Sequence, residues 1–314
     1  MSTATAEQSV ERPRGVLDIV QEAFDLYVKA FINFWIPFLI LGVITGVFSS
    51  LLTIVNYSFT QEIRSGQSTN ILAYLVNLMI SVLTLTGLSF IGGAIATGMV
   101  VTMVRPVMTG QVTSLSEAFQ NAQRVFLQLI LASLLYGLIV SVGFLLLIIP
   151  GFIFLTWYYV FAICIVLEDE SVTGSLSRSK NLVSGDGWHV FRLIIVSLLV
   201  VGIIQAFLTS IVGFILPFDF VYTGANEASY IVGSFISSFV SSIVAPLTGI
   251  MTTLLYYDLK ARKQLTPDRP MYGSAPSGYA PYPSNTAQFC PNCGSALPND
   301  PSASHCPSCG NRYR

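Results

Sequence analysis

The sequence predicts an all-α polytopic membrane protein with six transmembrane helices, short interfacial helices and a small C-terminal zinc ribbon on a disordered linker. Three observations lead to this fold class. Apolar residues make up 53% of the 314 residues and charged residues only 10%, whereas soluble domains have about 25% charged residues. Apolar runs of about 20 residues, long enough to span a bilayer, recur along the chain. Two CxxC pairs follow near the C-terminus.

Composition divides the chain into four parts. Residues 1–14 are polar and are expected to be disordered, and residues 15–262 contain all the long apolar runs of the predicted six-helix membrane domain. Residues 263–288 form a linker rich in Pro, Ser and Gly, and residues 289–314 hold the zinc ribbon. Because the linker cannot bury enough apolar surface to fold, we expect a flexible spacer.

Six apolar runs are predicted to cross the membrane. The third and fourth are separated only by Pro150-Gly151, which predicts a tight turn without charge. If residues 125–168 were instead one kinked helix, the chain would have five spans and its termini would lie on opposite sides. The predicted spans are residues 31–55, 75–104, 125–148, 151–168, 190–215 and 230–257.

Basic residues decide between six and five spans. With six spans, Arg64 lies on one side and twelve basic residues lie on the other, whereas five spans would scatter them. The positive-inside rule then places both termini in the cytoplasm, and we expect a plasma-membrane protein. The twelve are Arg12, Arg14, Lys29, Arg105, Arg124, Arg178, Lys180, Arg192, Lys260, Arg262, Lys263 and Arg269.

Short amphipathic segments before the odd-numbered spans indicate an internal repeat. Glu-Ala-Phe at 22–24 followed by Lys29 matches Glu-Ala-Phe at 117–119 followed by Arg124, and a looser copy starts at Ser171. We interpret these as three units, each an interfacial helix followed by a two-span hairpin. The alternative is chance similarity among amphipathic stretches.

A series of motifs in the second half of the membrane domain resembles one known family. They are Leu-Ile-Ile-Pro-Gly at 147–151, Trp-Tyr-Tyr at 157–159, Val-Leu-Glu-Asp-Glu-Ser at 166–171, Ser-Leu-Ser-Arg-Ser at 175–179 and Gly-Trp at 187–188. The motifs resemble the membrane domain found beside glycerophosphodiester phosphodiesterases and in related six-span inner-membrane proteins. The resemblance covers about residues 15–260 and implies an all-helical six-span domain. It does not imply catalysis, because the phosphodiesterase is a separate soluble barrel for which this chain has no room.

Polar residues inside the spans favour helix packing over chemistry. The central part of each predicted span lacks ionisable residues, which would be functional candidates. We expect Asn77, Gln128 and Gln205 to form hydrogen bonds between helices. Small residues on the second and sixth spans predict close helix approach, although the serines of the sixth could instead line a polar pore. These are Gly92, Gly93, Ala96, Gly98, Ser234, Ser237, Ser238, Ser241 and Ser242.

Three further features are candidates for chemistry. The acidic residues 168–170 are expected to form a solvated loop that caps the following helix, with a divalent-metal or substrate site as the alternative. We expect His189, beside Trp188, to anchor the chain at the lipid headgroups, and Cys164 to be a small buried apolar residue. No Ser/His/Asp set or Gly-rich phosphate loop is apparent, so we expect no enzyme.

Four cysteines near the C-terminus predict one structural zinc ion. Cys290 and Cys293 form one CxxC pair, and Cys306 and Cys309 form another after twelve intervening residues. Four thiolates close a tetrahedral shell without an open position for water, which is typical of structural zinc. Metal binding would supply the folding energy of so short a segment. Iron or a redox dithiol is the alternative.

These features favour a membrane scaffold or assembly protein that recruits a cytoplasmic protein through the ribbon. Besides the lipid bilayer, a cytoplasmic protein is therefore the expected partner. Nucleic acid is not expected, because from Phe289 onward only Arg312 and Arg314 are basic. The main alternative is a transporter or channel for a small or lipid-like solute, and a membrane enzyme is a third.

Overall fold

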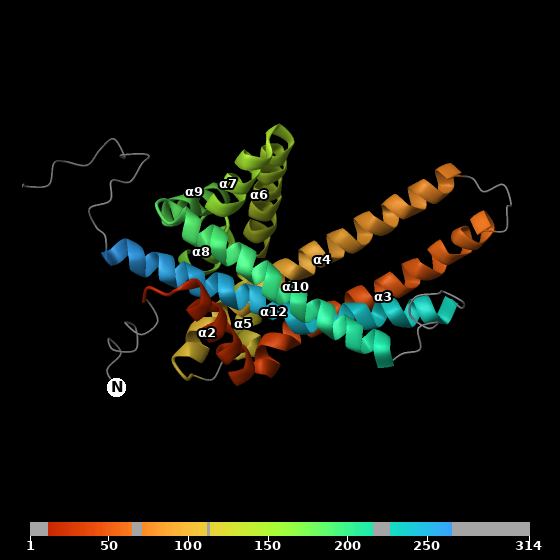
Figure 1. The fold of residues 1–314 in the computed structure, drawn as a ribbon, viewed down its shortest axis with the longest axis horizontal. Coiled ribbons are helices and arrows are strands. Elements are labelled where there is room, and N and C mark those ends of the chain that lie inside the picture. Colours follow the sequence, from red (N-terminus) through yellow and green to blue (C-terminus); the bar gives the residue numbers. More distant parts are fainter. Residues whose placement is uncertain (1–11, 65–70, 112–113, 216–226, 266–314) are drawn as a thin grey trace, which may run out of the picture. The chain divides into compact units, whose positions relative to one another are not determined.

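The computed structural model describes residues 12–64, 71–111, 114–215 and 227–265, and every regular element in these ranges is a helix. This agrees with the predicted all-α class, and Figure 1 shows the helices coloured along the chain. They are α2 (Val16–Lys29), α3 (Phe31–Arg64), α4 (Ile71–Met108), α5 (Leu115–Arg124), α6 (Phe126–Leu146), α7 (Ile148–Trp157), α8 (Phe161–Glu168), α9 (Val172–Val183), α10 (Gly187–Ile215) and α12 (Glu227–Leu265).

Six helical stretches in the described ranges are long and apolar enough to cross a membrane, as predicted. The fourth combines α7 and α8. The sixth ends later than predicted, so Asp258 lies inside this stretch and not after it. The stretches are Phe31–Leu52, Leu72–Met108, Phe126–Leu146, Ile148–Glu168, Gly187–Val212 and Ile231–Gln264.

Large apolar side chains remain exposed along these helices. Met79 is 73% exposed, Leu83 75% and Phe214 92%. Water-soluble proteins rarely leave so much apolar surface uncovered, whereas lipid tails cover it without cost. The exposure therefore agrees with a multi-pass membrane protein.

Three short helices precede the first, third and fifth spans, where the sequence predicted amphipathic segments. On α2, Ile19, Ala23 and Tyr27 are buried, and their spacing places them on one face. Ser114 and Ser171 are the N-cap residues of α5 and α9, and the hydroxyl of each accepts a first-turn N–H. The predicted short helices are confirmed, and their position at a membrane interface stays a prediction.

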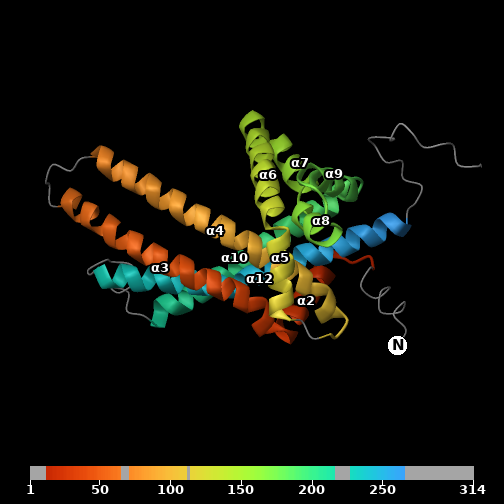
Figure 2. The same ribbon diagram turned by 180° about the vertical axis from the view of Figure 1, so that it is seen from behind.

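The first two pairs of long helices form hairpins, whereas the third pair is more open. α3 packs along α4, and α6 packs along α7. α12 touches α10 but packs chiefly along α3, as Figures 1 and 2 show. α12, the last helix of the described ranges, thus packs against the first long one.

Small residues allow α12 to approach α3 closely. A Cβ atom added to Gly42 would lie 2.9 Å from Ser242 Cβ. Ser242 Oγ accepts a hydrogen bond from Trp35 Nε1 at 3.2 Å, and the hydroxyls of Ser50 and Ser234 lie 3.2 Å apart. These serines of the sixth span serve helix packing, as the sequence predicted.

The turn between α6 and α7 lies at Leu147 and not at Pro150-Gly151, so the predicted position was wrong. Leu147 has extended dihedral angles (φ −161°, ψ 149°). Pro150 lies in the first turn of α7, where an N–H has no intrahelical partner to lose. Gly143 and Gly151 let the two helices meet, because a Cβ atom on Gly143 would lie 3.0 Å from Gly151 Cα.

The fourth span is interrupted between Trp157 and Phe161. Ser179 of α9 is fully buried against this break. Its hydroxyl donates to the Trp157 carbonyl at 2.9 Å and accepts the Val160 N–H at 3.3 Å. One side chain thus partners both peptide groups, which would otherwise be costly to bury.

The main core lies where the short helices meet the long ones. Val100 and Val104 of α4, Leu254 and Leu255 of α12, and Ile19 of α2 are all fully buried in it. The polar residues of the candidate site lie at this same end of α12.

Candidate functional site

A buried carboxylate on α12 organises the first polar cluster. Asp258 is 0% exposed. One of its oxygens accepts the backbone N–H of Arg14 at 2.6 Å, and Arg262 Nε lies 2.9 and 3.0 Å from the two oxygens. A buried charge is tolerated when it is paired and hydrogen-bonded in this way. Asp258 therefore joins the segment before α2 to the end of α12.

His189 belongs to the same cluster. Its side chain is 9% exposed, and Nε2 lies 3.0 Å from Asp258 Oδ2. The distance suits an ion pair, but no acceptor within the described residues has hydrogen-bond geometry toward Nε2. The ring of His189 faces a buried carboxylate, and its predicted position at the headgroups stays a prediction. Trp188 beside it is 69% exposed and remains available for that role.

Arg14 and Glu22 extend the cluster along α2. The side chain of Arg14 is 1% exposed, and it contacts Glu22 through Nε at 2.7 Å and Nη2 at 3.1 Å. Arg12 adds a contact to Glu22 at 3.2 Å. Burial alone would raise the pKa of Glu22, but the hydrogen bonds and charges of these arginines outweigh it and hold the pKa below its ordinary value of 4.5.

A second cluster joins α8, α9 and α12. Glu168 accepts two hydrogen bonds from Arg178, at 2.7 and 2.9 Å, and one from the Tyr256 hydroxyl at 2.7 Å. The hydrogen bonds to Glu168 hold the pKa of Arg178 above its ordinary value. This fork-to-fork pairing fixes orientation as well as charge. Arg178 lies in the Ser-Leu-Ser-Arg-Ser motif, and Glu168 lies in the acidic motif.

The three acidic residues at 168–170 do not act together as the sequence suggested. Glu168 is paired as described above, and Asp169 forms an exposed ion pair with Arg124. Asp169 also has a left-handed backbone (φ 53°) that ends α8. The cap of α9 is Ser171 and not an acidic residue. The expectation of a solvated capping loop was therefore wrong for Glu168.

The predicted zinc ligands Cys290, Cys293, Cys306 and Cys309 lie outside the described residues. Within the described ranges, no group of three or more His, Cys, Asp or Glu side chains is arranged to hold a metal ion. Cys164 is fully buried in the core, as predicted.

Two of the three span amides behave as expected. Asn77 donates to Asn56 Oδ1 at 2.8 Å, between α4 and α3. Gln205 donates to Ser241 Oγ at 3.2 Å, between α10 and α12. Gln128 is exposed on α6. The two contacts are hydrogen bonds between helices, of the kind that polar residues form in membrane proteins.

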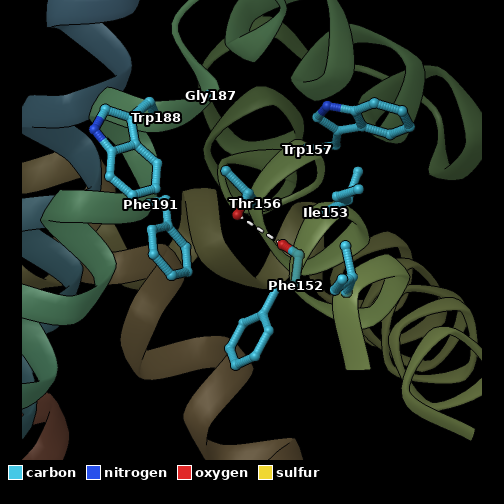
Figure 3. Close-up of a pocket in the computed structure, with 8 residues that line it drawn as sticks. Phe152, Ile153, Thr156, Trp157, Gly187, Trp188 and Phe191 are labelled. Carbon is cyan, nitrogen blue, oxygen red and sulfur yellow. Dashed lines mark hydrogen bonds between the residues drawn. The ribbon is translucent and has the colours of Figure 1, made fainter. Parts of the chain in front are cut away.

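An aromatic pocket of about 300 Å³ lies between α7 and α10. Figure 3 shows Phe152 and Thr156 of α7 opposite Trp188 and Phe191 of α10. The rings of Trp188 and Phe191 stack 5.4 Å apart, and Phe191 meets Phe152 edge-on at 5.8 Å. The Thr156 hydroxyl donates to the Phe152 carbonyl at 2.7 Å, so its proton is already engaged within α7. The pocket suits an apolar group such as a lipid acyl chain.

A family model described as a domain of unknown function, DUF7847, matches residues 16–259, which is more than half of the chain. The chain belongs to the DUF7847 family. The DUF7847 match begins with α2 and ends one residue after Asp258, so it contains the second polar cluster whole, whereas Arg12, Arg14 and Arg262 of the first cluster lie just outside it. No curated protein and no solved structure matches the chain.

Residue-by-residue reading of the sequence missed most of the polar residues in these DUF7847 clusters. Asp258 and Tyr256 were not named, and Arg14 and Glu22 entered only the charge count and the repeat, because their partners are far away in sequence. One local signal was available: Asp258 and Arg262 are four residues apart in a helix, a spacing that permits an ion pair.

Proposed function

We propose that this chain is a non-enzymatic membrane scaffold or assembly protein, which recruits a cytoplasmic protein through a zinc ribbon. The observation that carries the proposal is the pairing of the polar groups at the described end of the helices. Asp258, Glu168 and Glu22 are each held by an arginine within 3.0 Å. A general acid or base must be able to exchange protons with a substrate, whereas each of these carboxylates is engaged by an arginine. Such an arrangement supports a fixed platform.

The ribbon would be the recruiting part. Cys290, Cys293, Cys306 and Cys309 supply four thiolates in two CxxC pairs, a set that closes the coordination shell of zinc. The preceding linker, rich in Pro, Ser and Gly, would let the ribbon search the space near the membrane. Because a closed shell has no site for substrate, the ribbon is better suited to protein contact than to catalysis.

Both termini are proposed to lie in the cytoplasm, at the plasma membrane. The positive-inside rule supports this orientation, and three contacts support placing the basic segments on one side. Lys29 donates to the Val107 carbonyl at 3.1 Å, Arg124 pairs with Asp169, and Lys263 donates to the Ser184 carbonyl at 2.6 Å. These contacts join ends of spans that the six-span topology assigns to the same side.

A relation to the membrane domain beside glycerophosphodiester phosphodiesterases is part of the proposal. Two of the motifs that carry the resemblance have structural roles in this chain. Glu168 pairs with Arg178, and the Ser179 hydroxyl donates to the Trp157 carbonyl at the break in the fourth span. These roles are architectural. They support a shared helical framework and not a shared reaction.

The experiment is affinity purification of full-length protein from native membranes, compared with a Cys293→Ser/Cys309→Ser variant. We expect one zinc ion per intact chain by elemental analysis, no zinc in the variant, and a cytoplasmic protein that is recovered only with the intact chain. A Cys164→Ser variant is the matched control, because Cys164 is buried in the membrane domain. An unchanged set of partners after zinc loss would contradict the recruiting role.

A lipid-like solute carrier is the second candidate, and the aromatic pocket of Figure 3 favours it. A second apolar hollow of about 430 Å³ lies among α3, α4 and α5 and includes Pro37 and Phe119. If the protein carries lipids, a fluorescent lipid should move between the leaflets of proteoliposomes, and Phe191→Ala should slow this transfer. Transfer equal to that of protein-free vesicles would remove this candidate.

A further inference from the structure

A hollow of about 490 Å³ lies where the start of α2 meets α10 and α12. Its lining is strongly basic, and it is separate from the aromatic pocket. Arg14, Arg192, Arg262 and His189 line it together with one acidic residue, Asp18. The zinc ribbon and the scaffold role do not explain this composition.

Two of the arginines in the lining are held in place by carboxylates that do not themselves line the hollow. Arg262 is fixed by Asp258 at 2.9 Å, and Arg14 is fixed by Glu22 at 2.7 Å. Arg262 keeps 29% of its side chain exposed, so its guanidinium can meet a ligand without much loss of side-chain freedom on binding, whereas the side chain of Arg14 is 1% exposed and adds only its charge. Order of this kind favours a specific ligand over a diffuse counter-ion atmosphere.

Arg192 adds a cation that no carboxylate balances. It is exposed on α10 and forms no ion pair with any described residue. Three arginines and one carboxylate, that of Asp18, line the hollow, and the carboxylates of Glu22 and Asp258 pair with two of these arginines.

The backbone adds donors to the same hollow. The first N–H groups of a helix have no intrahelical acceptor and favour anions, and Val16 and Leu17 at the start of α2 line the hollow. Asp18 accepts the N–H of Gly15 at 3.0 Å, which leaves those two groups to other acceptors. His189 Nε2, buried in the same lining, also lacks hydrogen-bond geometry to any described acceptor.

We infer that this hollow binds a phosphate group, which comes either from the headgroup of a membrane lipid or from a soluble phosphate ester. Arg192 and Arg262 would contact the phosphate oxygens, and the first N–H groups of α2 would donate to them. Leu17 at the rim is 74% exposed, so an apolar chain attached to the phosphate would meet a matching surface. The inference does not depend on the proposed scaffold role.

The test uses full-length protein in an uncharged detergent and isothermal titration calorimetry. The probes are dihexanoyl phosphatidic acid, dihexanoyl phosphatidylcholine and inorganic phosphate. Saturable binding of phosphatidic acid alone identifies a lipid headgroup site. Binding of both phosphatidic acid and inorganic phosphate identifies a site for phosphate as such. Absence of binding by all the probes overturns the inference.

Two pairs of variants locate the site. Arg192→Gln should weaken binding about tenfold, since charge-assisted hydrogen bonds to an anion are lost. Arg124→Gln, which removes another exposed charge that does not line the hollow, should leave binding unchanged. Leu17→Asp should weaken binding by repulsion. Val28→Asp is its control, because Val28 is also 74% exposed on α2 but lies outside the lining.

The paired variants separate a built site from general attraction to basic residues. Equal losses for Arg192→Gln and Arg124→Gln, or for Leu17→Asp and Val28→Asp, would overturn the inference. The thermal unfolding midpoint shows whether the Arg192→Gln protein is folded. Leu17→Asp tests the same site independently, because it removes no arginine. Unchanged binding in both Arg192→Gln and Leu17→Asp would also overturn it.

Discussion

Asp258 accepts the backbone N–H of Arg14 at 2.6 Å, across 244 residues of sequence. This hydrogen bond fastens the segment before the first short helix to the last turns of the sixth span. Since Asp258 also contacts Arg262 and His189, one buried carboxylate connects the segment before α2, the start of α10 and the end of α12.

Replacing this carboxylate should destabilise the domain. Asp258→Asn retains one oxygen for the Arg14 N–H but removes the charge that Arg262 Nε contacts at 2.9 Å, at a cost of about 3 kcal/mol. The measurement is the thermal unfolding midpoint in detergent. Asp25→Asn is the control, because Asp25 is exposed on α2, and it should change the midpoint little. Equal shifts for both variants would show that burial of Asp258 is unimportant.

The hydroxyl of Tyr256 should stabilise the folded protein through its hydrogen bond to Glu168. Tyr256→Phe removes a 2.7 Å hydrogen bond to Glu168 in a side chain that is 2% exposed, so we expect a loss of about 1 kcal/mol. In a Glu168→Gln background the loss should be smaller, and a double-mutant cycle measures the difference. Additive losses of stability for Tyr256→Phe and Glu168→Gln would contradict a direct interaction between the two side chains. Tyr158→Phe is a suitable control, because the Tyr158 hydroxyl has no hydrogen-bond partner among the described residues.

The stability supplied by Glu22 should depend on pH. The pKa of Glu22 in the folded protein is below its ordinary value of 4.5, so its contribution is fully present above about pH 4.5 and is lost as the pH falls through the folded pKa. Glu22→Gln should therefore be less stable than the wild type by about 1 kcal/mol at pH 7. The difference should narrow toward pH 3. Denaturation in detergent across this range measures it, and a gap that stays constant with pH would contradict the charge-based account.

Gly143 should tolerate no side chain. A Cβ atom there would lie 2.7 Å from Phe154 Cδ2 and 3.0 Å from Gly151 Cα, so Gly143→Ala should destabilise the α6–α7 hairpin by about 1–3 kcal/mol. Gly137 on the same helix has nothing within 4 Å of its added Cβ. Gly137→Ala should therefore be neutral or stabilising. Similar unfolding midpoints for the two variants would rule out the close approach as a determinant of stability.

The sequence predicted the helices better than their contacts. Spans and short helices follow from hydropathy and local spacing, which act over a few residues. The turn at Leu147 was misplaced, because Pro and Gly usually mark turns, whereas here Pro150 starts a helix and Gly151 supplies a close contact. Local chemistry permits both uses of these residues, and tertiary packing decides between them.

The candidate site was less predictable for the same physical reason. His189 beside Trp188 has the local signature of an interfacial anchor, and only the fold brings it to Asp258. Glu168 likewise stands in an acidic run, but it pairs with Arg178 and Tyr256. Ion pairs between residues distant in sequence depend on helix packing, which a single sequence does not reveal.

The hydroxyl of Ser179 has a consequence for how the protein is made. It partners the Trp157 carbonyl and the Val160 N–H in the fourth span, yet it is synthesised after that span. If the break in the fourth span forms before α9 emerges, these two peptide groups lack partners, which lipid cannot supply. We therefore expect insertion of the second hairpin and docking of α9 to be coupled during biogenesis.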